Sequence, residues 1–558
     1  MKRLYGLLVL LCFMLTACND DFLDVDPVDR YSDAVVWTDE SLITSFVNNI
    51  YEGQKWGFHT VMLSSLCDES MEVWAWESQP VVMSELSPSY QGILAPNFWI
   101  ITFHNITWTN LYKNIRACNI FFENAEKYAL EGDVVDKLKG EVHYLRAYFY
   151  YWLLSQWGGI PLIEKSFTPS DDLLVARNTF EETVDFIVKD LDEAASILPL
   201  NGDKARATKG AAMGLKCRAL LYAASDLFNK PEEWAPGYTH KEYISMQDGK
   251  SQQERWEEAA AACNDFITTL GNKYPMDEYR LIRDYQNGEI IFDRRYGSTN
   301  TFEKNNYPVG YNLGQSGNTP SQNLVDAYEM IDGTPFDWNN PEHKSNPYAN
   351  RDPRLAMSIL TNNVEFKDRT IEAWTGGRDG KGVIHATRTG YYIYKFIDPN
   401  LDLLQNRTSV HHWVIMRYAE ILLSYAEAMN EAYGPTGNVG YRLNAVRALN
   451  QVRNRVGVEM PAVPTAISKE ELREKIRNER RVELAFEDHR FWDVRRWMIA
   501  PETLGAPLRG VEITKISDEE FEYNPIEVEK RTFEPKMYLY SIPQADLNTT
   551  GWVQNPLW

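Results

Sequence analysis

Cysteine and positive charge are both scarce in this sequence. Cysteine accounts for six of the 558 residues, and no CxxC pair or Cys/His cluster occurs, so we expect no structural zinc site. Lys and Arg total 57 against 79 Asp and Glu, which gives a formal net charge of −22. Because a polyanion is repelled by phosphate backbones and by anionic lipids, this composition argues against nucleic-acid binding and against electrostatic membrane binding.

The hydrophobic run at the N-terminus is short. Residues 4–15 are mostly apolar and follow two basic residues, and the run is too short to span a bilayer as a permanent helix. We therefore interpret residues 1–17 as a signal peptide. The run ends in LTAC, which resembles the bacterial lipobox, and Cys18 would then carry the lipid that anchors the protein. An ordinary signal peptide with an incidental Cys18 is the alternative.

The segment after the signal peptide is acidic, and the later cysteines are far apart. Residues 18–38 begin with CNDDFLDVDP, and we expect them to form a lipidated, solvated tether. Cys118, Cys217 and Cys263 lie among helix-forming residues and are expected to be buried thiols. Their spacing, and that of Cys67, does not assign a disulfide.

Helical periodicity dominates residues 39–270 and residues 411–500. Over 138–153 the apolar residues recur every three or four positions, and this helix is expected to end at Gly158 and Gly159. The same spacing over 415–429 predicts one continuous helix. Capping-box patterns mark helix starts at Thr179–Glu182 and Ser468–Glu471. Further helices are predicted at residues 39–53, 99–128, 206–228, 254–270 and 440–456.

Several of these helices form pairs of similar length with alanine-rich faces, which would let helices approach closely as in tetratricopeptide-type stacks. Residues 271–410 are instead rich in Gly, Pro, Asn, Asp and aromatics, and we predict loops with short strands at 289–296 and 391–397. Residues 501–558 have a similar character. The predicted fold is mainly α: a tetratricopeptide-like helix-pair superhelix with an irregular, loop-rich insertion and an irregular C-terminal tail.

Charge is concentrated in NERRVELAFEDHRFWDVRRW (478–497). On a single helix, Glu479, Glu483 and Glu487 would lie on one stripe and would repel each other unless arginines neutralise them. The pairs expected along this helix are Arg480–Glu483, Arg490–Glu487, Arg490–Asp493 and Asp493–Arg496. Such pairing lowers the pKa of a carboxylate, whereas a general acid needs a raised pKa. We therefore interpret the stretch as an ion-pair scaffold and not as an active site.

Several segments, taken in order, resemble the SusD/RagB family of Bacteroidetes outer-membrane lipoproteins. IRNERRVELAFEDHRFWDVRRW (476–497) is similar to the family's C-terminal helix signature, and the acidic run after Cys18 resembles surface-export signals of such lipoproteins. The resemblance extends to EVHYLRAYFYYWLLSQWGGIPLI (141–163), RYAEILLSYAEAMNEA (417–432) and YSIPQADLNTTGWVQNP (540–556).

The resemblance implies a non-catalytic binding protein with its ligand site on the irregular part of the chain. The implied ligand is a glycan, the implied partner is a SusC-like TonB-dependent transporter, and the implied location is the outer surface of the outer membrane, with lipidated Cys18 as anchor. A binding lipoprotein for peptides or another non-sugar nutrient would share this fold. An all-α glycoside hydrolase is a further alternative, but it would need two carboxylates in a cleft, one of them with a raised pKa.

Sugar rings stack on aromatic faces, so tryptophans flanked by polar residues are the pattern to seek. LCDESMEVWAWESQP (66–80) places Trp74 and Trp76 two positions apart, beside Glu72 and Glu77. If the chain is extended there, both rings point to the same side. We predict a stacking platform, and packing of both indoles onto the first helices is the alternative.

Other aromatic residues are weaker candidates. Trp374 lies in a Gly-rich segment that we expect to be an exposed, mobile loop, from which Arg378 and Asp379 could reach sugar hydroxyls. Trp99 and Trp108 are predicted to be core residues. No cofactor is predicted, and Asp332 and Asp337 alone fall short of a calcium loop, although a structural calcium stays open. The remaining candidates are Trp56 with His59, Tyr296, Tyr311 and Trp338.

Overall fold

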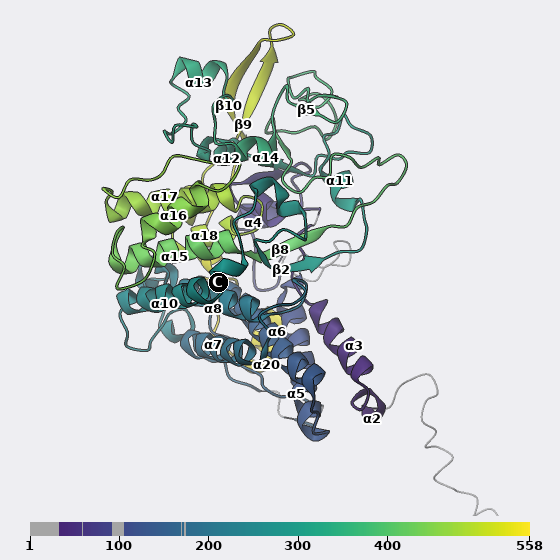
Figure 1. Ribbon diagram of the computed structural model, residues 1–558, viewed down its shortest axis with the longest axis vertical. Coiled ribbons are helices and arrows are strands. Elements are labelled where there is room, and N and C mark those ends of the chain that lie inside the picture. The colour runs from purple at the N-terminus through teal and green to yellow at the C-terminus, as the bar shows by residue number, and fades with distance from the viewer. Residues whose placement is uncertain (1–32, 59, 92–104, 169, 172–173) are drawn as a thin grey trace, which may run out of the picture.

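A computed structural model describes residues 33–58, 60–91, 105–168, 170–171 and 174–558 of the chain (Figure 1). The predicted signal peptide, Cys18, most of the acidic tether, His59 and Trp99 lie outside the described residues. Over the described ranges, no helix combines the length and the apolar character needed to cross a membrane.

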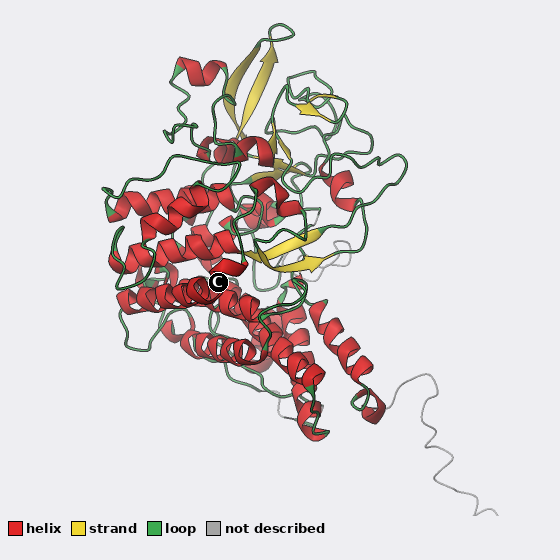
Figure 2. Ribbon diagram, viewed as in Figure 1, coloured by secondary structure: helices red, strands yellow, loops and turns green. Residues whose placement is uncertain are grey.

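Helices are the main regular secondary structure and gather on one side of the molecule, whereas most strands and long loops gather on the other (Figure 2). This is the mainly-α architecture that the periodicity predicts. The long helices are α3 (Glu40–Tyr51), α5 (Trp108–Lys127), α6 (Asp133–Trp157), α7 (Phe180–Ile197), α8 (Lys209–Ala224), α10 (Gln252–Leu270), α15 (Tyr418–Tyr433), α16 (Ala445–Arg453) and α17 (Lys469–Glu483).

Short helices occur mainly in the connections. They are α2 (Asp33–Val36), α4 (Gln79–Val82), α9 (Pro231–Trp234), α11 (Thr301–Asn306), α12 (Gln322–Ala327), α13 (Pro341–Ser345), α14 (Arg354–Ser358), α18 (Arg490–Arg496), α19 (Ala500–Thr503) and α20 (Gln544–Thr550).

Local signals place several helix ends as expected. Thr179 and Ser468 form the predicted capping boxes with Glu182 and Glu471. Helix α6 ends at Gly158, whose φ of 75° favours glycine. The predicted helix over 415–429 begins later, at Tyr418, because the preceding residues form strand β8 and pair with β2.

The long helices pack in chain order. Helix α5 lies against α6, α6 against α7, α7 against α8, and α8 against α10. Helix α10 then packs against α15, which also contacts α16 and α17. The two helical parts of the sequence therefore form one continuous stack, although the loop-rich segment separates them along the chain. The assignment of the pairs as tetratricopeptide-like stays a prediction.

The strands of the described residues form small two-stranded antiparallel sheets. The strand pairs are β1 (Ser70–Glu72) with β3 (Asn318–Pro320), β2 (Ile290–Arg295) with β8 (His412–Arg417), β4 (Ile359–Leu360) with β7 (Tyr392–Ile393), β5 (Glu365–Phe366) with β6 (Arg369–Thr370), and β9 (Leu508–Lys515) with β10 (Phe521–Glu529).

The strand predictions were only partly right. Residues 289–296 contain β2, but 391–397 contain only the two-residue β7. The predicted irregular tail contains the β9–β10 hairpin, which projects from the top of the molecule in Figure 1.

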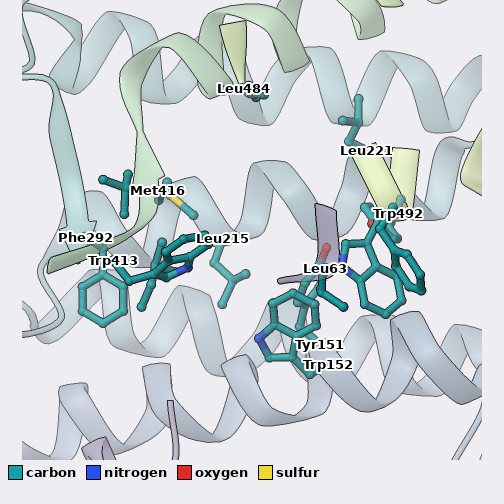
Figure 3. Packing of buried hydrophobic residues seen from close by; sticks show 14 of the residues in the cluster. Leu63, Tyr151, Trp152, Leu215, Leu221, Phe292, Trp413, Met416, Leu484 and Trp492 are labelled. Carbon is teal, nitrogen blue, oxygen red and sulfur yellow. The ribbon is translucent and has the colours of Figure 1, made fainter. Parts of the chain in front are cut away.

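The β2–β8 pair packs directly on the helical stack. Phe292 of β2 and Trp413 and Met416 of β8 meet Leu215 of α8 in a buried cluster (Figure 3). Gly214 makes this approach possible, because a Cβ atom there would sit 2.1 Å from the Met416 sulfur. The thiols of Cys67, Cys118, Cys217 and Cys263 are buried and free, as expected for the three in helices.

Candidate functional site

The charged stretch 478–497 is not a single helix. Helix α17 ends at Glu483 and α18 begins at Arg490, and between them Phe486 and Asp488 have φ values of 63° and 64°. The Lys395 ammonium donates to the carbonyls of Glu483 and Ala485, both at 3.0 Å, and thereby satisfies the free end of α17. The helical stripe predicted for its glutamates therefore stops at Glu483: Glu479 and Glu483 share α17, whereas Glu487 lies outside the helix.

The carboxylates of this stretch pair mostly with cations from remote parts of the chain. Glu483 accepts from Arg417 at 2.6 Å, from Arg354 at 2.8 Å and from Arg455. We call this buried cluster the arginine network; its members are Glu289, Arg354, Lys395, Arg417, Arg455, Glu479, Glu483 and Glu487. Of the pairs expected along a single helix, the described contacts include only Asp493–Arg496, at 2.8 Å.

The arginine network keeps the carboxyl groups of Glu483 and Glu487 ionised. Burial alone would raise the pKa of Glu483, but the guanidinium groups of Arg455, Arg417 and Arg354 hold it well below its usual range. Arg417 and Lys395 likewise lower the pKa of Glu487 against the effect of burial. This is the electrostatics of a scaffold and the opposite of what a general acid requires.

His489 and Asp488 do not form a catalytic pair either. The Asp488 carboxylate bonds the buried Lys55 ammonium. Burial, and then the positive charge of Arg218 and Arg480, lower the pKa of His489 well below its usual value. The adjoining cavity has a volume of about 30 Å³, which is room for about two water molecules but not for a sugar ring.

The tryptophan pair predicted to bind ligand lies at the end of a short strand. β1 runs antiparallel to β3, with Glu72 opposite Asn318, and the Val73 amide donates to the Gly317 carbonyl at 2.9 Å. The chain then turns sharply, because Ala75 has a φ of 55°. The extended geometry required for parallel indoles is therefore absent between Trp74 and Trp76.

The two indoles consequently have different environments. Trp76 is 71% exposed, although large hydrophobic side chains are usually covered. Trp74 is half-buried, and its ring lies edge-on to that of His385, with 6.1 Å between the ring centroids. Packing onto the first helices, the alternative interpretation, does not describe Trp76. Its free indole face is available for stacking.

A third chain segment brings His385 to this place. His385 has a φ of 62°, and the loop that carries it is fixed where the Thr387 amide donates to the Tyr392 hydroxyl at 3.2 Å. Ile384, next to His385, is 80% exposed. We call the cluster of Glu72, Trp74, Trp76, Glu77 and His385 the tryptophan site.

Two carboxyl groups lie beside the indoles without a cationic partner. Glu72 accepts from the Ser78 amide at 2.8 Å through one oxygen, while its other oxygen and one oxygen of Glu77 are buried and have no partner in the described structure. Burial, and then the charge of Glu72, raise the pKa of Glu77 to about 7. Burial also raises the pKa of Glu72. Glu72 is wholly buried, contrary to its prediction as a ligand residue, so of the two carboxyl groups only that of half-buried Glu77 borders the surface where a ligand hydroxyl could donate to it.

Two other candidates, Trp56 from the N-terminal helical part and Tyr296 from the insertion, lie together in a different cluster. Trp56 meets Tyr296 edge-on at 6.3 Å, and the Arg294 guanidinium lies 5.0 Å from the centroid of the Trp56 ring. The Tyr296 hydroxyl accepts from the Gly57 amide at 3.3 Å. Among the described ring pairs, none joins this cluster to Trp74 or Trp76.

The structure gives Tyr311 and Trp338 packing roles. Tyr311 is buried, donates to the Phe366 carbonyl at 2.9 Å, and stacks under Arg369 at 3.9 Å. The Trp338 indole donates to Asp326 at 3.0 Å. Neither ring is placed as the free loop aromatic that the sequence suggests.

The Trp374 ring is packed against another part of the chain and is not fully exposed. Trp374 packs on Phe521 of β10 with ring centroids 5.4 Å apart. Asp379, expected to reach ligand, is buried and accepts from Arg369 at 2.6 and 2.9 Å. Arg378 is 67% exposed and stays a candidate. Trp108 is buried, which confirms its prediction as core.

Metal ligation finds no support in the described residues, which contain no cluster of three or more His, Cys, Asp or Glu placed to hold an ion. The Asp332 carboxylate instead accepts from the amide and hydroxyl of Thr334, at 2.9 and 2.6 Å.

Sequence reasoning did not find His385 and Ile384. Both lie some 300 residues from the tryptophans, and the positive φ of His385 follows from tertiary contacts. The Gly-rich composition around 375–390 was the available signal that this loop reaches the surface.

Known proteins resemble both halves of the chain. Residues 288–558 match a family model described as SusD family, and residues 21–221 match a model described as starch-binding associating with outer membrane. A SusD-like protein of Formosa agariphila is 24% identical over 426 residues, which is 73% of this chain and 74% of that protein.

Solved structures agree with the fold. A SusD-like protein of Bacteroides fragilis has a TM-score of 0.77 and 29% identity, with 96% of this chain and 100% of that chain covered. A SusD-like carbohydrate binding protein, also of Bacteroides fragilis, has a TM-score of 0.72 and 24% identity, with 92% of this chain and 98% of that chain covered. The predicted mainly-α, SusD-like architecture is thereby confirmed.

Proposed function

Because the chain belongs to the SusD family, we propose that it is a non-catalytic glycan-binding lipoprotein of the outer membrane that delivers its ligand to a SusC-like TonB-dependent transporter. Lipidated Cys18 anchors it on the cell surface, and the acidic segment 18–38 tethers the folded part. The ligand is an oligosaccharide or polysaccharide, bound at the tryptophan site.

One observation carries the choice of site: Trp76 is 71% exposed and lies next to half-buried Glu77, one carboxyl oxygen of which has no hydrogen-bond partner among the described residues. An indole face binds the C–H face of a sugar ring, and carboxylate oxygens accept from the hydroxyls at its rim. Burying an exposed indole against a sugar also removes apolar area from water.

Two features support the absence of catalysis. In the charged stretch 478–497, ion pairs keep the carboxyl groups of Glu483 and Glu487 ionised, so these two have no proton to give. Glu72 and Glu77 both have raised pKa values, whereas a glycoside hydrolase needs one raised carboxyl and one that stays ionised.

The test is electrophoresis of the purified protein through gels that contain single polysaccharides or host glycoproteins, with an assay for released reducing ends. Retardation by a glycan that Trp74→Ala/Trp76→Ala abolishes, without new reducing ends, supports the proposal. Trp338→Ala is the control, because its indole is held by Asp326 away from this cluster and retardation should persist. Retardation by no glycan would favour a peptide or other nutrient, and released reducing ends would contradict the non-catalytic assignment.

A further inference from the structure

A groove of about 520 Å³ lies between the start of α5, the segment that follows α6, and the C-terminal segment around α20. This volume is in the range of small-molecule sites. We call it the Trp552 groove. It shares no residue with the tryptophan site. The residues that matter below are Tyr112, Lys113, Arg116, Asp546 and Trp552.

The aromatic walls of the groove are fixed by their own polar atoms. The Trp552 indole donates to the Val175 carbonyl at 2.7 Å, and the Tyr112 hydroxyl donates to the Pro161 carbonyl at 3.0 Å. Trp108 buttresses both rings, with its centroid 5.0 Å from that of Tyr112 and 6.4 Å from that of Trp552. The half-buried rings therefore present their apolar faces to the groove. Because they are already held in place, binding costs little side-chain conformational entropy.

The rim of the groove carries positive charge that has no ionic partner among the described residues. Lys113 and Arg116 lie three positions apart on one face of α5, both are exposed, and neither forms an ion pair with any described residue. By contrast, Lys165 at the same groove pairs with Asp171 at 3.3 Å. In a chain with a net charge of −22, two unpaired cations beside an aromatic wall are a local exception that suits an anionic ligand.

One carboxyl group completes the donor and acceptor set. Asp546 is half-buried in the groove, and its carboxyl group makes no hydrogen bond to the described residues. Burial raises its pKa. The Asp546 carboxyl group can therefore form a hydrogen bond with a ligand hydroxyl, while Lys113 and Arg116 bind a charged group of the same ligand.

We propose that the Trp552 groove is a second ligand site, which binds a glycan that carries carboxylates, such as a uronic-acid oligosaccharide. The sugar face packs on Trp552 and Tyr112, the sugar carboxylate pairs with Arg116 and Lys113, and a hydroxyl bonds Asp546. The tryptophan site has the opposite charge, because Glu72 and Glu77 disfavour an acidic sugar. The two sites thereby select glycans of different charge.

The test is isothermal titration of the purified protein with tetragalacturonate, and with maltotetraose as the neutral probe. Wild-type protein should bind tetragalacturonate, and Arg116→Ala should weaken binding about tenfold, with partial recovery in Arg116→Lys. Lys127→Ala removes the same charge from the last turn of the same helix, outside the groove, and should change affinity less than twofold. Trp74→Ala/Trp76→Ala should leave this binding intact, so the second site can stand or fall independently of the first.

Several results would overturn the proposal. These are the absence of tetragalacturonate binding, equal weakening by Arg116→Ala and Lys127→Ala, and loss of binding in Trp74→Ala/Trp76→Ala. If maltotetraose bound as tightly as tetragalacturonate, and Trp552→Ala abolished this binding, the groove would not select an acidic glycan. Self-association that requires Trp552, in a protein that binds neither probe, would assign the groove to a second copy of the chain.

Discussion

Residues 66–80 and 478–497 both combine tryptophan with dense carboxylates, yet the fold uses them differently. Asp68 accepts from Arg490 at 2.8 Å and from Arg481 at 2.7 Å, so the first half of 66–80 is bound to the charged stretch itself. Glu72 and Glu77, a few residues later, have no cation at all among their described contacts. What separates scaffold from binding surface is therefore whether the fold supplies an arginine, and not the acidic residue itself.

The largest loss of stability is expected from a substitution at the centre of the arginine network. Glu483→Gln leaves Arg354, Arg417 and Arg455 short of a countercharge in a buried place. We expect a loss of about 3–5 kcal/mol of unfolding free energy, measured by urea denaturation. Glu77→Gln is the matched control, since it makes the same chemical change outside the network. A loss below about 1 kcal/mol in Glu483→Gln would show that the network is not structural.

Glu69, a buried carboxyl group in residues 66–80, should behave in the opposite way. Removing its charge should stabilise the protein at high pH, whereas Glu483→Gln destabilises it. Burial, and then the charge of Asp68, raise the pKa of Glu69 from 4.5 to about 8. A raised folded-state pKa means that its contribution to stability is present below about pH 4.5 and is lost as the pH rises to about 8.

Glu69→Gln should therefore make the protein more stable at pH 8.5 and change it little at pH 4.5. The linkage relation sets an upper limit of about 5 kcal/mol, and we expect about 2 kcal/mol after relaxation around the charge. Thermal unfolding of both proteins across this pH range measures it. Parallel pH profiles for wild type and variant would contradict the assignment.

The Trp374 loop tests where the binding surface ends. Trp374→Ala removes packing on Phe521 and a contact with the Lys515 ammonium 4.8 Å from its ring. We expect a loss of about 1 kcal/mol in stability and a glycan affinity within twofold of wild type. Loss of binding with unchanged stability would extend the ligand surface to this loop.

Glu77 should show the smallest effect on stability. Near pH 4.5, where the Glu77 carboxyl group is protonated in the folded protein and glutamine imitates it, Glu77→Gln is expected to change the unfolding free energy by no more than about 0.5 kcal/mol. Because an ionised carboxylate accepts better from hydroxyls, wild-type glycan affinity should rise as the pH passes about 7, and the variant should lack this inflection. Titration calorimetry at pH 6 and pH 8 measures it, and an inflection retained in Glu77→Gln would assign the pH dependence to another group.

Local signals in the sequence predict the helices well, because capping and periodicity act over a few residues. Thr179, Ser468 and Gly158 each fix a helix end from within one turn. The partners of Glu483 could not be predicted in this way. Arg354 lies 129 residues away in the chain, and only the packed fold brings it within 2.8 Å.

The candidate site was predicted only in part, because the sequence shows local patterns but not contacts between distant segments. Trp76 and Glu77 were found because polarity around tryptophan is a local pattern. His385 was missed because a distant loop delivers it, and the turn at Ala75 was missed because a positive φ on alanine has no sequence signature. The sequence around Tyr311 and Trp338 does not distinguish a packed aromatic ring from an exposed one. Only their contacts with Arg369 and Asp326 show that both rings are packed.

The most direct test of the account is titration of wild type and Trp76→Ala with the glycan that retards the protein, together with their unfolding midpoints. Because Trp76 is 71% exposed, its removal should leave the midpoint unchanged while affinity falls at least tenfold. An affinity that the substitution leaves unchanged would contradict the claim that the ligand binds at residues 66–80, whose Glu72 and Glu77 have no described cationic partner, and not at the ion-paired stretch 478–497.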